Sequence, residues 1–76
     1  MEMQDFIEKF AFQLEDQNIE INAETNYVQS EFWDSLTAMV VKVMIEDEYG
    51  FDIPVNKLNQ FTSIESLFNY IEENKK

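Results

Sequence analysis

The spacing of apolar residues near the start of the chain predicts a first helix over residues 3–15. Five apolar side chains recur there at intervals of three and four, which places them on one face of a helix: Met3, Phe6, Ile7, Phe10 and Leu14. Phe12 lies off this stripe, and the pattern leaves open whether it is exposed or packs under the following segment. We therefore expect an amphipathic helix that buries one apolar face.

Residues 16–33 show no sustained period and predict a long loop. Polar and turn-prone residues predominate there, and a few apolar residues stand among them: Ile19, Ile21, Tyr27 and Val28. A loop of this length is uncommon inside a compact domain and is often functional. Because a flexible linker would be richer in Gly, Ser or Pro, we expect the apolar residues to pin this loop to the core.

Local signals bound the second helix, which is predicted from Ser35 to Tyr49. Asp34 stands where a carboxylate would accept hydrogen bonds from the free amides of the first turn. Gly50 can adopt the left-handed conformation that ends a helix. The Ile53-Pro54 pair then keeps the chain out of helical conformation, because the residue before a proline avoids helical backbone angles.

The remaining pattern predicts one short and one longer helix. A helical turn is expected within residues 55–61, with Leu58 and Phe61 facing inward. Thr62 and Glu65 fit a capping box, with Thr62 as the cap and Glu65 reaching back. Apolar residues then follow the helical spacing: Ile64, Leu67, Phe68 and Ile71. The sequence thus predicts an all-α fold in one domain over residues 1–76, a small antiparallel bundle of three main helices plus one short helix.

The second helix carries two apolar stripes on nearly opposite sides, at about 100° per residue. One stripe suits a core: Ala38, Val41, Ile45 and Tyr49. The other consists of Leu36, Val40, Val43 and Met44, and Met39 lies between the two stripes. A bundle this small has few elements to cover both stripes. We expect the second stripe to stay partly open as a docking surface, the alternative being a helix that is buried nearly all round.

Composition and charge exclude several kinds of scaffold and binding partner. Of the 76 residues 45% are hydrophobic, which is enough for a core, and the absence of Cys and His excludes a disulfide or zinc scaffold. The formal net charge of −11 makes nucleic acid and anionic membrane surfaces unfavourable partners and favours basic proteins. The acidic run over residues 46–48 lacks the spacing of a calcium loop, so no metal site is expected.

The chain also lacks the signals of membrane or secreted proteins. No apolar run approaches the roughly 20 residues that span a bilayer. The N-terminal stretch carries acids where a signal peptide would need positive charge. We therefore expect no membrane span and a cytoplasmic location.

Ser35 is the candidate for chemistry, at the first turn of the second helix. Its simplest role is structural, helping Asp34 to satisfy free amides. A catalytic nucleophile would need a positioned base, but there is no His and Lys42 lies two turns away, so no catalytic residue is expected. A third role is an attachment point, because a phosphate on the Ser35 oxygen would lie at the positive end of the helix.

The stretches DSLTAMVVKVMIEDEYGFDIP and TSIESLFNYIEE resemble the acyl carrier protein family, whose members carry a 4′-phosphopantetheine arm on the serine of Asp-Ser-Leu. The tripeptide alone is a weak signal. The acidic run, Tyr49-Gly50, Ile53-Pro54 and Thr62 follow it at the family's spacing, and length, charge and order of elements also match. The resemblance covers nearly the whole chain.

The resemblance implies a role for each matching residue. Ser35 would carry the arm, taken from coenzyme A, and its thiol would hold acyl groups as thioesters. Asp34 would help bind the magnesium that the phosphopantetheinyl transferase uses, and Leu36 would contact partners at the root of the arm. The other partners would be acyl-ligase, ketosynthase or acyltransferase enzymes with basic and apolar patches, bound by a monomer through Leu36, Val40, Val43, Met44, Glu46, Asp47 and Glu48. The domain itself would be no enzyme.

Departures from the family pattern leave several alternatives open. Phe32 stands where many members have glycine, and Trp33 is either a core plug or a partner-facing aromatic. Thr37 and Val40 stand where fatty-acid members commonly carry acids, which favours a dedicated pathway at least as much as housekeeping fatty-acid synthesis. The alternatives in function are an aminoacyl or peptidyl carrier and an unmodified acidic adaptor. The charge of −11 favours acyl cargo, whose chain length the sequence leaves open.

Overall fold

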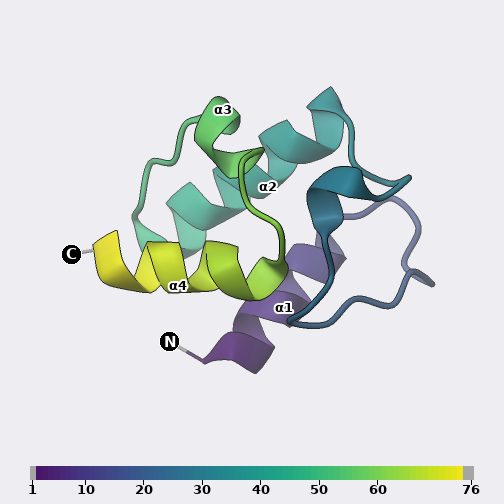
Figure 1. The fold of residues 1–76 in the computed structure, drawn as a ribbon, viewed down its shortest axis with the longest axis horizontal. Helices are drawn as coiled ribbons and strands as arrows, with labels where there is room; N and C mark the ends of the chain where they lie inside the picture. The colour runs from purple at the N-terminus through teal and green to yellow at the C-terminus, as the bar shows by residue number, and fades with distance from the viewer. Residues whose placement is uncertain (1, 75–76) are drawn as a thin grey trace.

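The computed structural model describes residues 2–74, which form a helical bundle (Figure 1). Its elements are α1 (Met3–Phe12), a 3₁₀ turn η1 (Tyr27–Gln29), α2 (Ser35–Tyr49), α3 (Val55–Leu58) and α4 (Ile64–Asn74). Three of the α-helices are long and α3 has four residues, and the described part of the chain contains no strand. The predicted all-α fold is confirmed.

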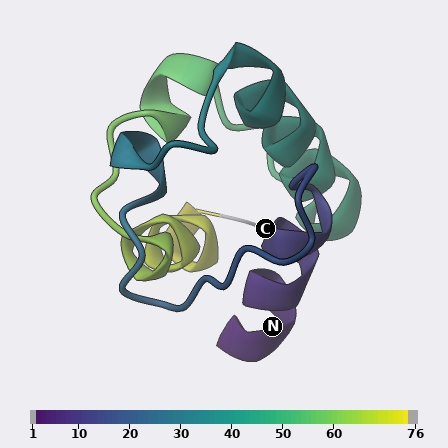
Figure 2. The same cartoon turned by 90° about the vertical axis from the view of Figure 1, so that its right-hand side faces the viewer.

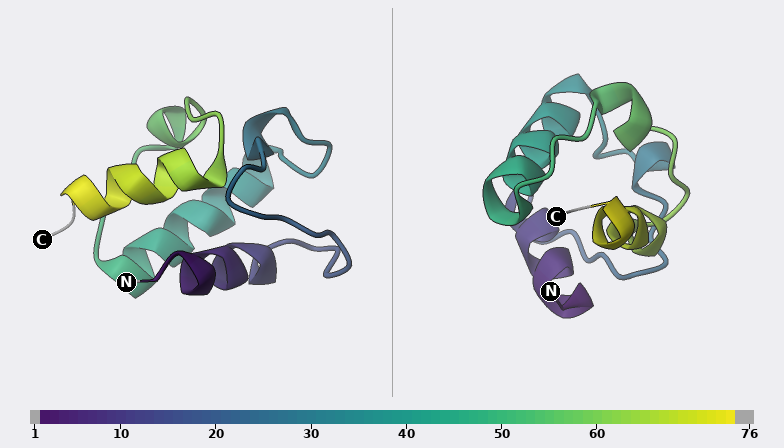
Figure 3. Two further views of the ribbon diagram at one scale, coloured as in Figure 1. Left: turned by 60° about the horizontal axis from the view of Figure 1, so that its bottom comes forward. Right: turned by 90° about the vertical axis from the view of Figure 1, so that its left-hand side faces the viewer.

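The helices surround one apolar core. Figure 3 (left) shows α1 and α2 running in opposite directions, with α4 running in the same direction as α2. The buried residues include the predicted stripe of α4, Phe6 and Phe10 of α1, and Leu14 just beyond it. Of the predicted core stripe of α2, Ala38, Val41 and Ile45 are buried and Tyr49 is partly buried. Phe6 lies at the centre of an aromatic cluster, with ring centroids 6.3 Å from Phe10, 5.8 Å from Tyr49 and 5.6 Å from Phe68. Because the chain has no cysteines and so no disulfides, close packing of these large rings is its main source of stability.

The first helix ends earlier than its apolar pattern predicts. It stops at Phe12 instead of residue 15, although Leu14 stays buried beyond its end. The Gln17 side chain donates hydrogen bonds to the carbonyl oxygens of Ala11 and Phe12, both at 3.3 Å, and to that of Leu14. The Ala11 carbonyl also accepts from the Leu14 amide at 3.1 Å, so Gln17 mainly supplies a donor to the carbonyls of Phe12 and Leu14 at the helix end. A side chain beyond the apolar stripe therefore sets this boundary.

Local capping sets both ends of α2, as predicted. Asp34 Oδ1 accepts a hydrogen bond from the Thr37 amide at 2.8 Å. Gly50 adopts a left-handed conformation with φ 65°, and its amide donates to the Glu46 carbonyl at 3.0 Å. The helix bounds Ser35–Tyr49 are confirmed.

The cap of α4 lies one residue later than predicted. The helix begins at Ile64, so that Ser63, not Thr62, precedes it. Ser63 Oγ accepts from the Ser66 amide and Ser66 Oγ accepts from the Ser63 amide, both at 3.1 Å. This is the reciprocal geometry of a capping box. Thr62 as cap was wrong because an adjacent hydroxyl takes that role.

The long loop is pinned to the bundle, as predicted from its apolar residues. Tyr27 is fully buried, and Ile19, Ile21 and Val28 pack against the core. The loop also caps α4, since the Ile64 amide donates to the Thr25 carbonyl at 3.0 Å and the Glu65 amide to the Ala23 carbonyl at 2.8 Å. Figure 2 shows the loop crossing the end of the bundle on its way to η1.

Candidate functional site: the N-terminus and open face of helix α2

Ser35 is the first residue of α2 and its side chain is exposed. The residue before it, Asp34, is also exposed and turns the chain into the helix with an extended backbone. The Ser35 hydroxyl is therefore open to an approaching enzyme. A buried hydroxyl would have excluded a role as an attachment point.

The carboxylate of Asp34 is held in its charged form. The Thr37 amide, followed by the Thr37 hydroxyl, stabilises this anion and lowers the pKa of Asp34 below its ordinary value of 3.8. The group is thus ionised at neutral pH, directly beside Ser35. A carboxylate in this position is a suitable oxygen ligand for a hydrated magnesium ion.

Within residues 2–74, the lysine of α2 is not a general base for Ser35. Lys42 is the one lysine on α2, and its Nζ lies 2.7 Å from Asp52 Oδ1. The hydrogen bond to Asp52 raises the pKa of Lys42, so this amine stays protonated. A protonated lysine on another part of the helix cannot take the proton of the serine hydroxyl.

Ser35 opens onto a surface hollow between α2 and α3, with a volume of about 450 Å³. The walls of this hollow are apolar and polar side chains from three segments: Trp33, Asp34, Ala38, Met39, Val55 and Asn59. Phe32 faces a different hollow on the other side of the helix start, together with Leu14, Ile19 and Thr37. The neighbourhood of Ser35 therefore combines an exposed hydroxyl with apolar walls.

Trp33 is packed into the bundle. Its ring stacks on Phe10 with centroids 6.0 Å apart and meets Tyr27 edge-on at 4.6 Å. Its Nε1 donates to Asn59 Oδ1 at 2.7 Å, beyond the end of α3. Of the two roles considered for Trp33, these contacts support the core plug that holds the loop.

The residues around Ser35 fit a phosphate-linked arm. The oxygen that would carry the phosphate lies at the first turn of a 15-residue helix, where the helix dipole favours an anion. The hollow beside it gives the apolar part of an arm a surface to lie on. No bulky side chain covers the Ser35 hydroxyl, because that residue is exposed.

Most of the second apolar stripe of α2 is open, as expected for a docking surface. Leu36 is 64% exposed and Val43 is 46% exposed, while Val40 is half-buried. Met44 is the exception, because it is only 5% exposed and belongs to the core. The expectation that Met44 lies on the open stripe was wrong. The reason is that α1 packs against this flank of α2, where Lys9 and Gln13 line a hollow together with Met44 and Glu48.

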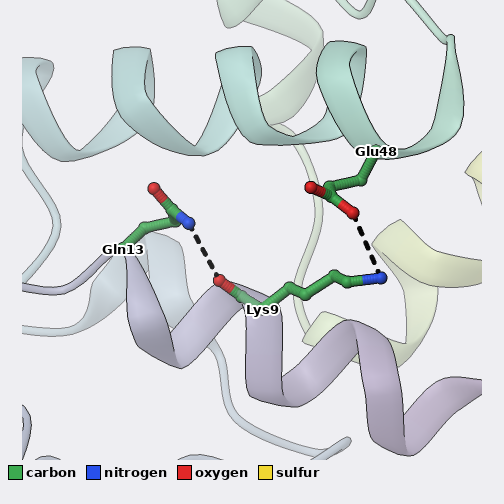
Figure 4. Close-up of polar contacts among 3 residues, drawn as sticks. All are labelled: Lys9, Gln13 and Glu48. Atoms are coloured by element: carbon green, nitrogen blue, oxygen red, sulfur yellow. Dashed lines mark hydrogen bonds and ion pairs between the residues drawn. The ribbon is translucent and has the colours of Figure 1, made fainter.

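The acidic run beside this stripe is exposed, but its three members differ. Glu48 Oε1 lies 3.3 Å from Lys9 Nζ (Figure 4), whereas within residues 2–74 neither Glu46 nor Asp47 forms an ion pair. The hydrogen bond from Lys9 to Glu48 raises the pKa of Lys9. Glu48 thus ties α2 to α1, and its charge is partly neutralised within the chain.

Two exposed apolar residues lie outside the predicted site: Met39, which the sequence analysis did not assign to it, and Phe12, whose exposure the sequence left open. Met39 is 49% exposed and lines both the hollow at Ser35 and a second hollow on the open stripe. Phe12 is 76% exposed at the end of α1, beside a hollow that it shares with Lys9, Met44 and Glu48. The sequence indicated their exposure only by placing both residues off the main apolar stripes. That position does not reveal which flank a neighbouring helix covers.

These features define a class of protein: a small helical domain that displays a serine at a capped helix start beside an open apolar and acidic face. Residues 4–71 match the family model described as "Phosphopantetheine attachment site". The chain therefore belongs to this family of phosphopantetheine-binding carrier domains, of which the acyl carrier proteins are members. Its members carry covalently attached 4′-phosphopantetheine and act as carriers, not as enzymes.

A curated relative supports the same assignment. The chain is 29% identical over 56 residues to a protein of Rickettsia bellii (strain RML369-C) named "Acyl carrier protein". The match covers 74% of this chain and 65% of the relative, so the chain spans about two thirds of that protein's length. No solved structure matches. Within residues 2–74, none of the helices has the length and apolar character needed to cross a bilayer.

Proposed function

We propose that this chain is an acyl carrier protein that carries its 4′-phosphopantetheine arm on Ser35. The single observation that supports this most is the exposed Ser35 hydroxyl at the capped start of α2, inside the segment that matches the family. Residues 1–76 act as one carrier domain, as a monomer in the cytoplasm.

The arm is attached by a partner enzyme. Ser35 Oγ forms a bond to the phosphorus that bears pantetheine in coenzyme A, and the bond from that phosphorus to the second phosphate breaks. Adenosine 3′,5′-bisphosphate leaves, and the hydroxyl proton passes to a base of the transferase, since Lys42 stays protonated and Asp34 is engaged with the Thr37 amide. Asp34 contributes its ionised carboxylate to the magnesium site of that complex.

The open face of α2 receives the partner enzymes. Leu36 lies at the root of the arm and, with Val40 and Val43, presents the apolar part of the surface. Glu46, Asp47 and Glu48 add negative charge at its far end, which steers basic patches of a transferase, an acyl-ligase, a ketosynthase or an acyltransferase toward it. Met44 supports this face from below, as a buried residue.

Attached to Ser35, the arm supplies a thiol that holds acyl groups as thioesters. The net charge of −11 and the match to a protein named "Acyl carrier protein" favour acyl over aminoacyl cargo. Thr37 and Val40 make the docking face less acidic than in fatty-acid carriers, which supports a dedicated pathway. An aminoacyl or peptidyl carrier remains the second candidate, because it would use the same serine and fold.

The proposal is tested by loading the arm and then the thiol. The protein with its arm attached is offered to an acyl-ligase with a fatty acid and, separately, to an adenylation enzyme with an amino acid. We expect acylation by the ligase, seen as a gain of one acyl group in the intact mass. Loading by the adenylation enzyme alone would favour the aminoacyl carrier, and a protein that never accepts the arm would favour the acidic adaptor.

A further inference from the structure

One aromatic side chain, Trp33, belongs both to the lining of the hollow at Ser35 and to the packing around the core. Trp33 lines this hollow, whereas Phe10 and Tyr27, which are fully buried, do not. Trp33 packs against both of these rings, stacked on Phe10 at an interplanar angle of 16° and edge-on to Tyr27 at 65°. The indole ring therefore stands between the hollow and the aromatic core.

Hydrogen bonds at the end of α3 fix this ring in place. The indole Nε1 donates to Asn59 Oδ1 at 2.7 Å, and the Tyr27 hydroxyl donates to the carbonyl of Leu58 at 2.6 Å. Both acceptors lie at the C-terminal end of the short helix, so Trp33 joins the start of α2, and Tyr27 joins η1, to the end of α3. Moving the ring would break the bond to Asn59 and cost Phe10 and Tyr27 one of their packing partners.

We propose that Trp33 determines cargo length, keeping acyl chains out of the core, and that the cargo is a short acyl group held against Trp33, Ala38 and Val55. This inference rests on the proposed attachment of the arm to Ser35. A short chain can be covered by the walls of the surface hollow. A long chain would extend past them into water and lose the free energy of burial, since the aromatic core is already filled.

Acyl chains of two lengths test the inference on the intact protein. A phosphopantetheinyl transferase of broad specificity loads the apo protein with the arm from butyryl- or dodecanoyl-coenzyme A, and the intact mass confirms one addition. The melting temperature and the emission of Trp33, the only tryptophan of the chain, are then measured for both forms. We expect the two forms to melt at the same temperature with the same emission maximum.

Two variants weaken the barrier that Trp33 forms between the hollow at Ser35 and the core. In Trp33→Ala the ring is absent, and in Asn59→Ala the ring loses its hydrogen-bond acceptor. We expect the dodecanoyl form of these variants to melt several degrees above the butyryl form, because the chain can now enter the core. Asn56→Ala is the matched control, since this exposed asparagine of α3 does not line the hollow, and it should behave as the wild type.

The outcomes separate the role of Trp33 from the attachment of the arm to Ser35. A wild-type dodecanoyl form that melts well above the butyryl form, with a shifted Trp33 emission, would overturn the role of Trp33. The absence of a chain-length effect in both opened variants would overturn it as well. A protein that gains no mass at all would instead contradict the proposed attachment to Ser35, so the two failures are distinguishable.

Discussion

Lys9 of α1 and Glu48 of α2 form an ion pair, with 3.3 Å between Nζ and Oε1. The Lys9 amine also lies 5.3 Å from the centre of the Tyr49 ring, so one lysine contacts two neighbouring residues at the end of α2. The two charged side chains are about half exposed, at 41% and 47%, and the pair adds only modest stability for that reason. Its larger effect is on charge, because it makes Glu48 less available than Asp47 to a partner.

We predict that Asp47→Asn weakens partner binding more than Glu48→Gln. The charge of Asp47 has no cation beside it within residues 2–74, whereas that of Glu48 is already offset by Lys9. The measurement is the KM of each variant as substrate of a phosphopantetheinyl transferase at low ionic strength. An equal or larger effect of Glu48→Gln would show that the ion pair opens when the partner binds.

We predict that Met44→Ala lowers the free energy of unfolding by about 2–5 kcal/mol, the usual cost of removing a buried methionine side chain. The neighbouring Val43→Ala should cost less than about 1 kcal/mol, because Val43 is 46% exposed and alanine favours the helix. Urea denaturation of the two variants provides the comparison. Similar losses would mean that α1 does not cover Met44.

The bounds of α2 could be predicted from the sequence because they depend on local chemistry. Asp34 caps the first turn and Gly50 takes the left-handed conformation, and neither requires a distant partner. The buried residues of α4 could be predicted from helical spacing for the same reason. The exposed position of Ser35 follows from the capped helix start.

The predictions that failed concern features that depend on contacts between segments. Met44 is buried because α1 lies along its flank, which helical periodicity within α2 does not reveal. The end of α1 depends on the Gln17 side chain, and the start of α4 depends on a choice between adjacent hydroxyls. The packing of Trp33 on Phe10 and Tyr27 joins three segments, so the sequence left its role open.

We predict that added salt raises the melting temperature of the protein at neutral pH. With a net charge of −11, repulsion among the exposed carboxylates destabilises the compact state at low ionic strength, and salt screens it. Magnesium chloride should act at lower concentration than sodium chloride, because a divalent cation screens and binds carboxylates more strongly. Calorimetry at matched ionic strength checks this, and a melting temperature indifferent to both salts would contradict it.

We predict that the stabilising effect of Asp34 disappears in acid. Its pKa in the folded protein lies below the ordinary value of 3.8, because the Thr37 amide and hydroxyl bind the charged form. A lowered pKa means that this stabilisation is complete above the unfolded value and is lost as the pH falls through the folded value. The melting temperature of the wild type should therefore exceed that of Asp34→Ala at pH 7 and approach it in acid.

Asp47→Ala serves as the control for this pH series, since it removes the same charge from the other end of α2 without removing a cap. Relief of general charge repulsion is common to both variants, and the difference between them isolates the cap. A difference that stays constant from pH 7 into acid would show that the charge on Asp34 does not strengthen the cap.

The central claim is that the Ser35 hydroxyl is the attachment point of the arm. The most direct measurement is the intact mass of the apo protein after incubation with coenzyme A, magnesium and a phosphopantetheinyl transferase of broad specificity. We expect one phosphopantetheine group on the wild type and on Ser30→Ala, whose serine lies in the loop, and none on Ser35→Ala. A gain of mass by Ser35→Ala, or no gain by folded wild-type protein, would contradict the account.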